Sequence, residues 1–227
     1  MTKSFDAQDY LVRRARNEGQ LGVAGVYSPD MEHDACGVGF VAARDGQPNR
    51  AVVESAIEAL QAIWHRGAVD ADGMTGDGAG IHIEIPRDFF IEHIARTGHD
   101  DDGGRLAVGM VFLPRTDLAA QERCRCIVEE EILAFGHFIY GWRQVPVDTS
   151  ALGQKAIATR PEIEQIMFSM PTDMSEEDAE RQLYLVRRRI EKAVIQDLIS
   201  DFYICSLSTR SIIYKGMFLA EQVTAFS

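Results

Sequence analysis

The sequence predicts an α+β protein with mixed or antiparallel sheets packed against helices. Short apolar strand patterns and amphipathic helix patterns are interleaved along the 227 residues, but their spacing is uneven. Residues 202–207 and 210–215 read as two strands of a hairpin around Ser208 and Thr209. A regular parallel βαβ series requires a more even alternation, so we expect an α+β class instead.

The first 35 residues differ from the rest of the chain. They are polar and interrupted by glycines, so we interpret residues 1–35 as a leader that lies outside the core. At Cys36 the composition changes to a short apolar segment, and residues 36–43 are predicted to form a buried strand. The domain that follows the leader is therefore expected to begin at Cys36 and to continue to residue 227.

The helices are predicted from apolar residues that recur at helical spacing. In residues 50–64 these are Val53, Ile57, Leu60 and Trp64. Ser175 is expected to cap a long charged helix that reaches about residue 200, because a serine hydroxyl accepts from the N–H groups of a first turn. The apolar face of this long helix consists of Leu183, Val186, Ile190 and Val194. Further helices are expected at 86–95, 117–135 and 216–223.

The strands are predicted from alternating or short apolar runs. Ile81, Ile83 and Ile85 alternate with polar residues, as in a half-buried strand. Further strands are expected at 106–113, 137–147 and 162–169, and residues 148–160 read as a linker. Residues 67–80 form an acidic, glycine-rich loop that matches no Walker, dinucleotide-binding or EF-hand pattern. Loops of this length on a rigid scaffold often line functional sites.

Composition excludes several functions. The chain carries a net charge of −12, which argues against binding to nucleic acid or to an anionic membrane surface. No apolar run is long enough to span a bilayer, and residues 1–35 lack the apolar core of a secretory signal. The four cysteines therefore predict no disulfide framework, and we expect a cytoplasmic protein.

Three of the four cysteines are expected to be structural. Cys124 and Cys126 are two residues apart on a predicted helix and point in different directions, while Cys205 lies within a predicted strand. No paired cysteine or histidine motif is present, so no metal site is predicted. Cys36 differs because small residues follow it and would let a ligand approach. Local composition alone leaves two interpretations of Cys36 open, a buried strand cysteine and a nucleophile.

Four ordered blocks resemble a known family. They are residues 32–41 (EHDACGVGFV), 60–68 (LQAIWHRGA), 72–81 (DGMTGDGAGI) and 208–217 (STRSIIYKGM). The first and third are similar to the glutaminase domain of glutamate synthases, and the second to the His-Arg-Gly block of class II glutamine amidotransferases. The fourth block also fits the large, or alpha, subunit of glutamate synthase. The resemblance runs from about residue 27 to the end of the chain.

The resemblance implies a fold and a reaction. The fold is the four-layer αββα sandwich of the N-terminal nucleophile (Ntn) hydrolases. In this family a propeptide is removed, which here implies cleavage between Ala35 and Cys36. Cys36 would then attack the side-chain amide of glutamine and release ammonia for glutamate synthesis from 2-oxoglutarate. The resemblance also places Arg66 near the nucleophile, either as a substrate-binding residue or as a structural arginine that braces the loop.

The resemblance also implies cofactors and partners that the chain itself does not hold. No cofactor is expected within residues 1–227. FMN and an iron–sulfur cluster are implied for the synthase part of the large subunit, with electrons from NAD(P)H through FAD or from ferredoxin. The implied partners are glutamine, the remainder of the large subunit and a small reductase subunit.

The chain departs from the family pattern in one respect. Later blocks, which hold the glutamine carboxylate and amino groups and build the oxyanion hole, do not occur in residues 1–227. We therefore expect an incomplete sandwich, apparently truncated, with little glutaminase activity when isolated. Two alternatives stay open: a separate amidotransferase-like subunit of a split glutamate synthase, and a non-catalytic interaction module in which Cys36 belongs to the core.

Overall fold

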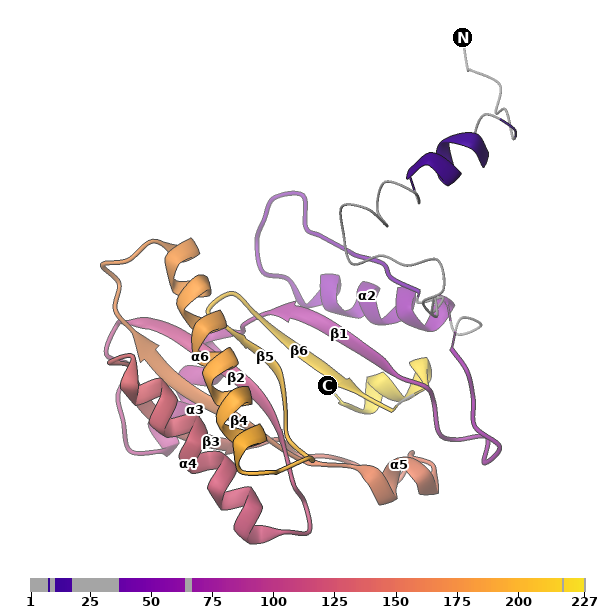
Figure 1. Ribbon diagram of the computed structural model, residues 1–227. Helices are drawn as coiled ribbons and strands as arrows, with labels where there is room; N and C mark the ends of the chain where they lie inside the picture. Colours follow the sequence, from indigo (N-terminus) through magenta and orange to yellow (C-terminus); the bar gives the residue numbers. More distant parts are fainter. Residues whose placement is uncertain (1–7, 9–10, 18–36, 64–66, 218, 227) are drawn as a thin grey trace. The chain divides into compact units, whose positions relative to one another are not determined.

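The computed structural model describes residues 8, 11–17, 37–63, 67–217 and 219–226. The chain divides into two units, Met1–Cys36 and Gly37–Ser227. In the first unit, residues 11–17 are helical and exposed. The second unit carries both sheets and the labelled helices of Figure 1.

The strands described in the second unit form two antiparallel sheets (Figure 1). The larger has the strand order β3–β4–β2–β5, and the smaller pairs β1 with β6. The strands are β1 (Ala79–Glu84), β2 (Arg105–Leu113), β3 (Phe138–Gln144), β4 (Glu162–Met170), β5 (Tyr203–Ser208) and β6 (Ser211–Gly216). The predicted α+β class with antiparallel sheets is therefore confirmed, since every strand pairing among the described residues is antiparallel.

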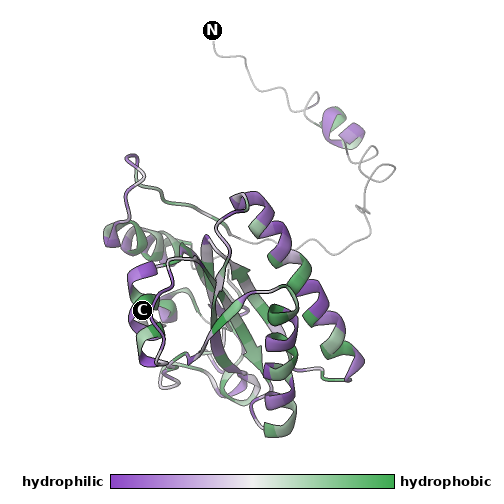
Figure 2. Ribbon diagram, turned by 90° about the vertical axis from the view of Figure 1, so that its left-hand side faces the viewer, coloured by the Kyte–Doolittle hydropathy of each residue, from purple (hydrophilic) through white to green (hydrophobic). Residues whose placement is uncertain are grey.

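Helices α4 (Leu118–Ala134) and α6 (Glu176–Gln196) cover one face of the larger sheet. The predicted stripe of α6 is fully buried, and Ser175 accepts a hydrogen bond from the Asp178 N–H at 3.1 Å, as a serine N-cap should. Figure 2 shows largely hydrophobic strands in the interior, whereas the helices around them alternate between hydrophobic and hydrophilic residues. The apolar face of each helix thus forms one core with the sheet.

A second core lies on the opposite face of the larger sheet. It joins Met110 and Met167 of that sheet to Ile212 of β6 and to Phe90 of α3 (Arg87–Arg96). Helix α2 (Arg50–Ala62) and the 3₁₀ helix η2 (Ala220–Phe226) contact β1. The two sheets therefore pack face to face between helices, which is the layering that the resemblance implied.

The predicted hairpin at residues 202–215 is wrong. Strands β5 and β6 belong to different sheets, so the chain crosses from one sheet to the other at Ser208 and Thr209. The reason is a helix far away in sequence: Glu180 of α6 accepts hydrogen bonds from the Ser208 and Thr209 hydroxyls and from the Thr209 N–H. A side chain of the helix layer thereby takes the place of the cross-strand bonds of a tight turn.

Two further predictions of secondary structure are wrong. The described part of the strand predicted at 36–43 has no regular structure, and Val38 and Phe40 are 90% and 94% exposed. No described strand pairs with this segment, and an apolar run forms a strand only where a partner strand satisfies its backbone. The linker predicted at 148–160 contains helix α5 (Gln154–Thr159). Too few residues form α5 for a helical period to be visible in the sequence.

Among the described histidines, His137 is the buried one, and it lies at the core between the larger sheet and helices α4 and α6. It is 3% exposed, packs between Phe135 and Phe168, and has no hydrogen-bond partner for either ring nitrogen among the described residues. Burial lowers the pKa of His137, because a charged imidazolium loses its hydration in an apolar core. The folded protein therefore keeps this ring neutral under conditions in which the unfolded chain begins to bind a proton.

We expect a His137→Phe variant to lose part of the acid sensitivity of the fold. Below the ordinary histidine pKa the unfolded chain binds a proton at residue 137 and the folded chain does not, so the free energy of unfolding falls as the pH falls. The slope reaches about 1.4 kcal/mol per pH unit between the ordinary and the lowered pKa. Urea unfolding between pH 7 and pH 5 measures it, with the exposed His82→Phe as control. Equal slopes in the parent protein and His137→Phe would contradict this assignment.

Candidate active site

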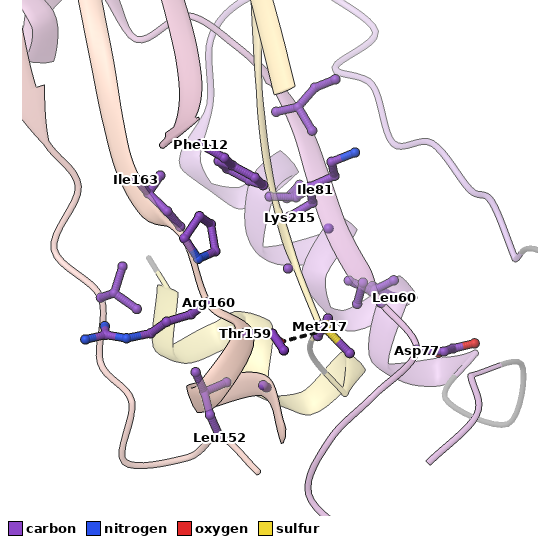
Figure 3. Close-up of a pocket in the computed structure, with 18 of the residues that line it drawn as sticks. Leu60, Asp77, Ile81, Phe112, Leu152, Thr159, Arg160, Ile163, Lys215 and Met217 are labelled. Atoms are coloured by element: carbon purple, nitrogen blue, oxygen red, sulfur yellow. Dashed lines mark hydrogen bonds between the residues drawn. The ribbon is translucent and has the colours of Figure 1, made fainter. Parts of the chain in front are cut away.

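A cavity of about 690 Å³ lies between the two sheets and α5. Its walls come from β1, from β6, from Phe112 and Ile163 of the larger sheet, and from Leu152 and Ala156 at α5. Figure 3 shows Ile163, Arg160 and Leu152 on one side of the cavity and Ile81, Leu60 and Asp77 on the other. The lining is mainly apolar and includes the charged residues Asp77, Arg160 and Lys215, as in many sites for small molecules.

The position of this cavity is what makes it a candidate active site. Gly37, the residue covalently bonded to Cys36, lines it. The glycine-rich loop also reaches it through residues 77–80. Gly80 lies where β1 and β6 approach closely: a Cβ atom at this position would be 2.6 Å from the Tyr214 carbonyl oxygen. A glycine is therefore required at this wall of the cavity.

The glycine-rich loop folds back on itself. Val69 and Gly76 form an isolated antiparallel bridge, and the Asp70 N–H donates to the Thr75 carbonyl at 2.9 Å. Within the turn, Asp72 Oδ1 accepts from the Met74 and Thr75 N–H groups. Acidic side chains of the loop thus accept hydrogen bonds from the loop's own backbone. Asp72 also accepts a hydrogen bond from the Thr75 hydroxyl, and this bond, followed by the two backbone bonds, lowers the pKa of Asp72.

Two polar groups of the cavity wall already have partners within the protein. The Thr159 hydroxyl donates to the Lys155 carbonyl at 2.9 Å and lies 3.7 Å from the Met217 sulfur, the contact dashed in Figure 3. Lys215 Nζ donates to the Tyr203 hydroxyl at 2.9 Å and lies over the Tyr203 ring. Both side chains are therefore fixed by neighbours before any ligand arrives.

The predicted site residues Ala35, Cys36 and Arg66 lie outside the described residues. The structure therefore describes their sequence neighbours, Gly37 and Gly67, and tests none of their roles. Sequence reasoning missed the contribution of α5 to the cavity. The linker-like composition of residues 148–160 gave no signal for it.

Two of the described cysteines, Cys124 and Cys205, are poor nucleophiles. Burial raises the pKa of Cys124 to about 11 and also raises that of Cys205, because a thiolate is disfavoured in an apolar core. The Cys205 thiol donates to the Ile213 carbonyl at 3.5 Å. Both cysteines are buried, which fits the structural role that the sequence predicted for them, and at neutral pH both remain protonated.

The described residues do not fit a metal centre or an iron–sulfur cluster. Among them, no group of three or more histidine, cysteine, aspartate or glutamate side chains is arranged to hold a metal ion. No helix in the described part of the chain is long and apolar enough to cross a membrane.

Comparison with known proteins identifies the family. Residues 36–227 match the class-II glutamine amidotransferases. The whole chain is 64% identical to 15% of the glutamate synthase [NADPH] large chain of Azospirillum brasilense. Ferredoxin-dependent glutamate synthase 2 of Synechocystis is 43% identical over 82% of this chain, and ferredoxin-dependent glutamate synthase 1 of Arabidopsis thaliana 39% identical over 86%. The chain spans about 12% of the length of these last two relatives. The chain therefore belongs to the class-II glutamine amidotransferases.

Proposed function

We propose that this chain is the glutaminase portion of a glutamate synthase, and that Cys36 attacks the side-chain amide of glutamine. The observation that carries the proposal is the cavity lined by Gly37, because Gly37 directly follows Cys36 in the sequence of a chain that belongs to the amidotransferase family. Its mainly apolar lining with a few charged residues suits a small polar substrate that must be shielded from bulk water.

The nucleophile requires a base, and we propose that the base is its own α-amino group. A thiol is only partly ionised at neutral pH, and a free α-amine on the same residue accepts its proton directly or through water. While Ala35 is attached, the same nitrogen is an amide and cannot act as a base. Residues 1–35 would thus be a leader whose removal activates the domain formed by residues 36–227.

The proposed reaction has two steps, the formation of a thioester and its hydrolysis. The Cys36 sulfur forms a bond to the glutamine side-chain carbonyl carbon, the C–N bond breaks, and the proton returns to the nitrogen as ammonia leaves. Water then attacks the γ-glutamyl thioester, which releases glutamate and restores the thiol. Arg66 is proposed either to contribute to substrate binding beside the nucleophile, where its guanidinium would donate hydrogen bonds, or to brace the loop as a structural arginine.

The ammonia is proposed to serve glutamate synthesis in the remainder of a larger protein. FMN, an iron–sulfur cluster and the site for 2-oxoglutarate are assigned to that part, where they would supply the reducing chemistry. The names of the relatives specify NADPH for one and ferredoxin for others. Either electron donor is therefore compatible with the proposal. NADPH would act through a small reductase subunit that carries FAD. A cytoplasmic location is proposed because Cys124, Cys126 and Cys205 are free thiols.

The proposal is tested by labelling the full-length protein with the glutamine analogue 6-diazo-5-oxo-norleucine. We expect intact and peptide mass spectra to show a polypeptide that starts at Cys36 and carries one adduct on that residue. Competition by glutamine is expected to slow the labelling. An uncut Ala35–Cys36 bond with an unlabelled Cys36 would instead support the non-catalytic interaction module and overturn the proposal.

A further inference from the structure

A set of contacts joins the glycine-rich loop to the start of α5. The Thr75 hydroxyl donates to Asp72 Oδ2 at 2.6 Å, and Thr75 is 1% exposed. Gly153, which is also buried, packs directly against this hydrogen bond: a Cβ atom at Gly153 would be 2.1 Å from Thr75 Oγ1 and 2.3 Å from Asp72 Oδ2. We call Asp72, Thr75 and Gly153 the loop clasp.

Two outer contacts reinforce the loop clasp. Lys155 of α5 donates to Asp70 Oδ2 at 2.7 Å, across an exposed part of the same interface. Gln222 of η2 donates to the Met74 carbonyl at 3.0 Å and also to the Ala151 carbonyl. One amide group therefore bridges the backbone of the loop and the backbone that leads into α5. Three segments distant in sequence are held together at one point.

The loop clasp lies where two walls of the cavity meet. On one side of it, the chain continues from Thr75 into residues 77–80, which line the cavity. On the other side, Leu152 directly precedes Gly153, Ala156 lies three residues after it, and both line the cavity. Figure 3 shows Leu152 on the side of the cavity away from Asp77. A shift between Asp72 and Gly153 therefore changes the distance between these walls, because each wall is within a few residues of the clasp.

We propose that the loop clasp sets the spacing of the cavity walls and thereby the affinity of the cavity for glutamine. Asp72, Thr75 and Gly153 are positioning residues, since none of them is itself a lining residue of the cavity. The identity of the ligand rests on the proposed function. The claim that the loop clasp holds the glycine-rich loop and α5 at a fixed distance rests on the contacts alone.

The sharpest test is Gly153→Ala in the full-length protein. The variant removes no hydrogen-bonding group and adds one carbon where the clasp leaves no room, so the loop and α5 must move apart. We expect the inhibition constant for 6-diazo-5-oxo-norleucine to rise between about ten- and a hundredfold, as ångström-scale misplacement typically produces. The rate at which iodoacetamide labels Cys36, a reaction that needs no recognition of glutamine, is expected to change less than about twofold.

Gly104→Ala is a matched control. Its Cβ atom would be 2.0 Å from Ser169 Oγ and 2.8 Å from Asp102 Oδ1, a similar clash with a similar hydroxyl–carboxylate hydrogen bond. This bond lies at the start of β2, and none of the three residues lines the cavity. The control is expected to lower the free energy of unfolding comparably while leaving the inhibition constant unchanged.

Variants of Asp72 distinguish a change in the spacing of the cavity walls from a general loss of stability. Asp72→Ala removes both acceptors of the clasp and is expected to raise the inhibition constant. Asp72→Asn keeps one carbonyl oxygen for the Met74 and Thr75 N–H groups, and the Thr75 hydroxyl rotates to accept from the amide. We therefore expect Asp72→Asn to restore an inhibition constant near that of the parent protein.

Hydrogen–deuterium exchange gives a readout that needs no glutamine chemistry. Gly153→Ala is expected to raise exchange in residues 69–78 as well as in 152–159, whereas Gly104→Ala leaves both segments unchanged. Faster exchange of the Gly153→Ala variant in residues 152–159 alone would overturn the proposed role of the loop clasp. If 6-diazo-5-oxo-norleucine labels the parent protein, an unchanged inhibition constant for Gly153→Ala would overturn it as well. Absence of labelling in the parent protein would overturn the proposed function instead, and exchange would then decide the clasp.

Discussion

A Cys36→Ala variant of the full-length protein is expected to lose ammonia release from glutamine by at least about 10³-fold. Removal of the nucleophile of a covalent mechanism removes the pathway itself and leaves only the weak catalysis of the surrounding site. Glutamate formation from 2-oxoglutarate and added ammonium should persist, because in the proposed function that reaction takes place outside this chain. Comparing glutamine with ammonium as the nitrogen source measures both effects in one preparation.

Cys126→Ser is the matched control for this substitution. Cys126 is partly exposed on α4, so its replacement removes a thiol without opening a cavity in the core. We expect this variant to keep its activity with glutamine. Substantial turnover of glutamine by Cys36→Ala, or equal losses with glutamine and ammonium, would contradict the role assigned to Cys36.

The second large effect is expected for Arg125→Met, in the contact between α4 and β4. Arg125 donates to both carboxylate oxygens of Glu164, from Nε at 2.8 Å and from the terminal nitrogen at 2.5 Å. Glu164 is 6% exposed, and its carboxylate raises the pKa of Arg125. Removal of the arginine leaves a buried carboxylate unpaired, which costs about 3 kcal/mol of unfolding free energy.

Urea unfolding followed by circular dichroism measures this loss. The double variant Arg125→Met with Glu164→Leu removes both charges, so we expect it to regain most of the stability that Arg125→Met loses. Arg181→Met is the surface control, because the Arg181 side chain is 71% exposed where it pairs with Glu177, and its expected cost is below about 1 kcal/mol. A loss for Arg125→Met no larger than that of the surface control would contradict the burial argument.

The long periodic elements were predictable from sequence because their apolar residues report directly on one buried face. Helix α6 is the clearest case: its stripe and its Ser175 cap both occur as predicted. The crossing at Ser208 was not predictable, because the acceptor that holds it is Glu180 of another layer. Local sequence contains no information on that contact, so the two strands read as a hairpin.

The candidate site was predictable to a lesser extent. The resemblance singled out Cys36 and Arg66, which lie outside the described residues, and their roles remain proposals. The length and glycine content of the glycine-rich loop made it a candidate for lining a site, and residues 77–80 do line the cavity. Its opposite wall came from a stretch interpreted as a linker. The close fit of Gly153 against Thr75 depends on tertiary packing, which neither composition nor periodicity reports.

The bonds of Glu180 to Ser208 and Thr209 also constrain the order in which the molecule folds. The donors at this corner have their acceptor only after α6 has docked on the larger sheet. Strand β6 pairs with β1, which lies far away in sequence, so the smaller sheet forms only when a long loop closes. We therefore expect the larger sheet with its two helices to form first, and the smaller sheet, and with it the cavity, to be completed last.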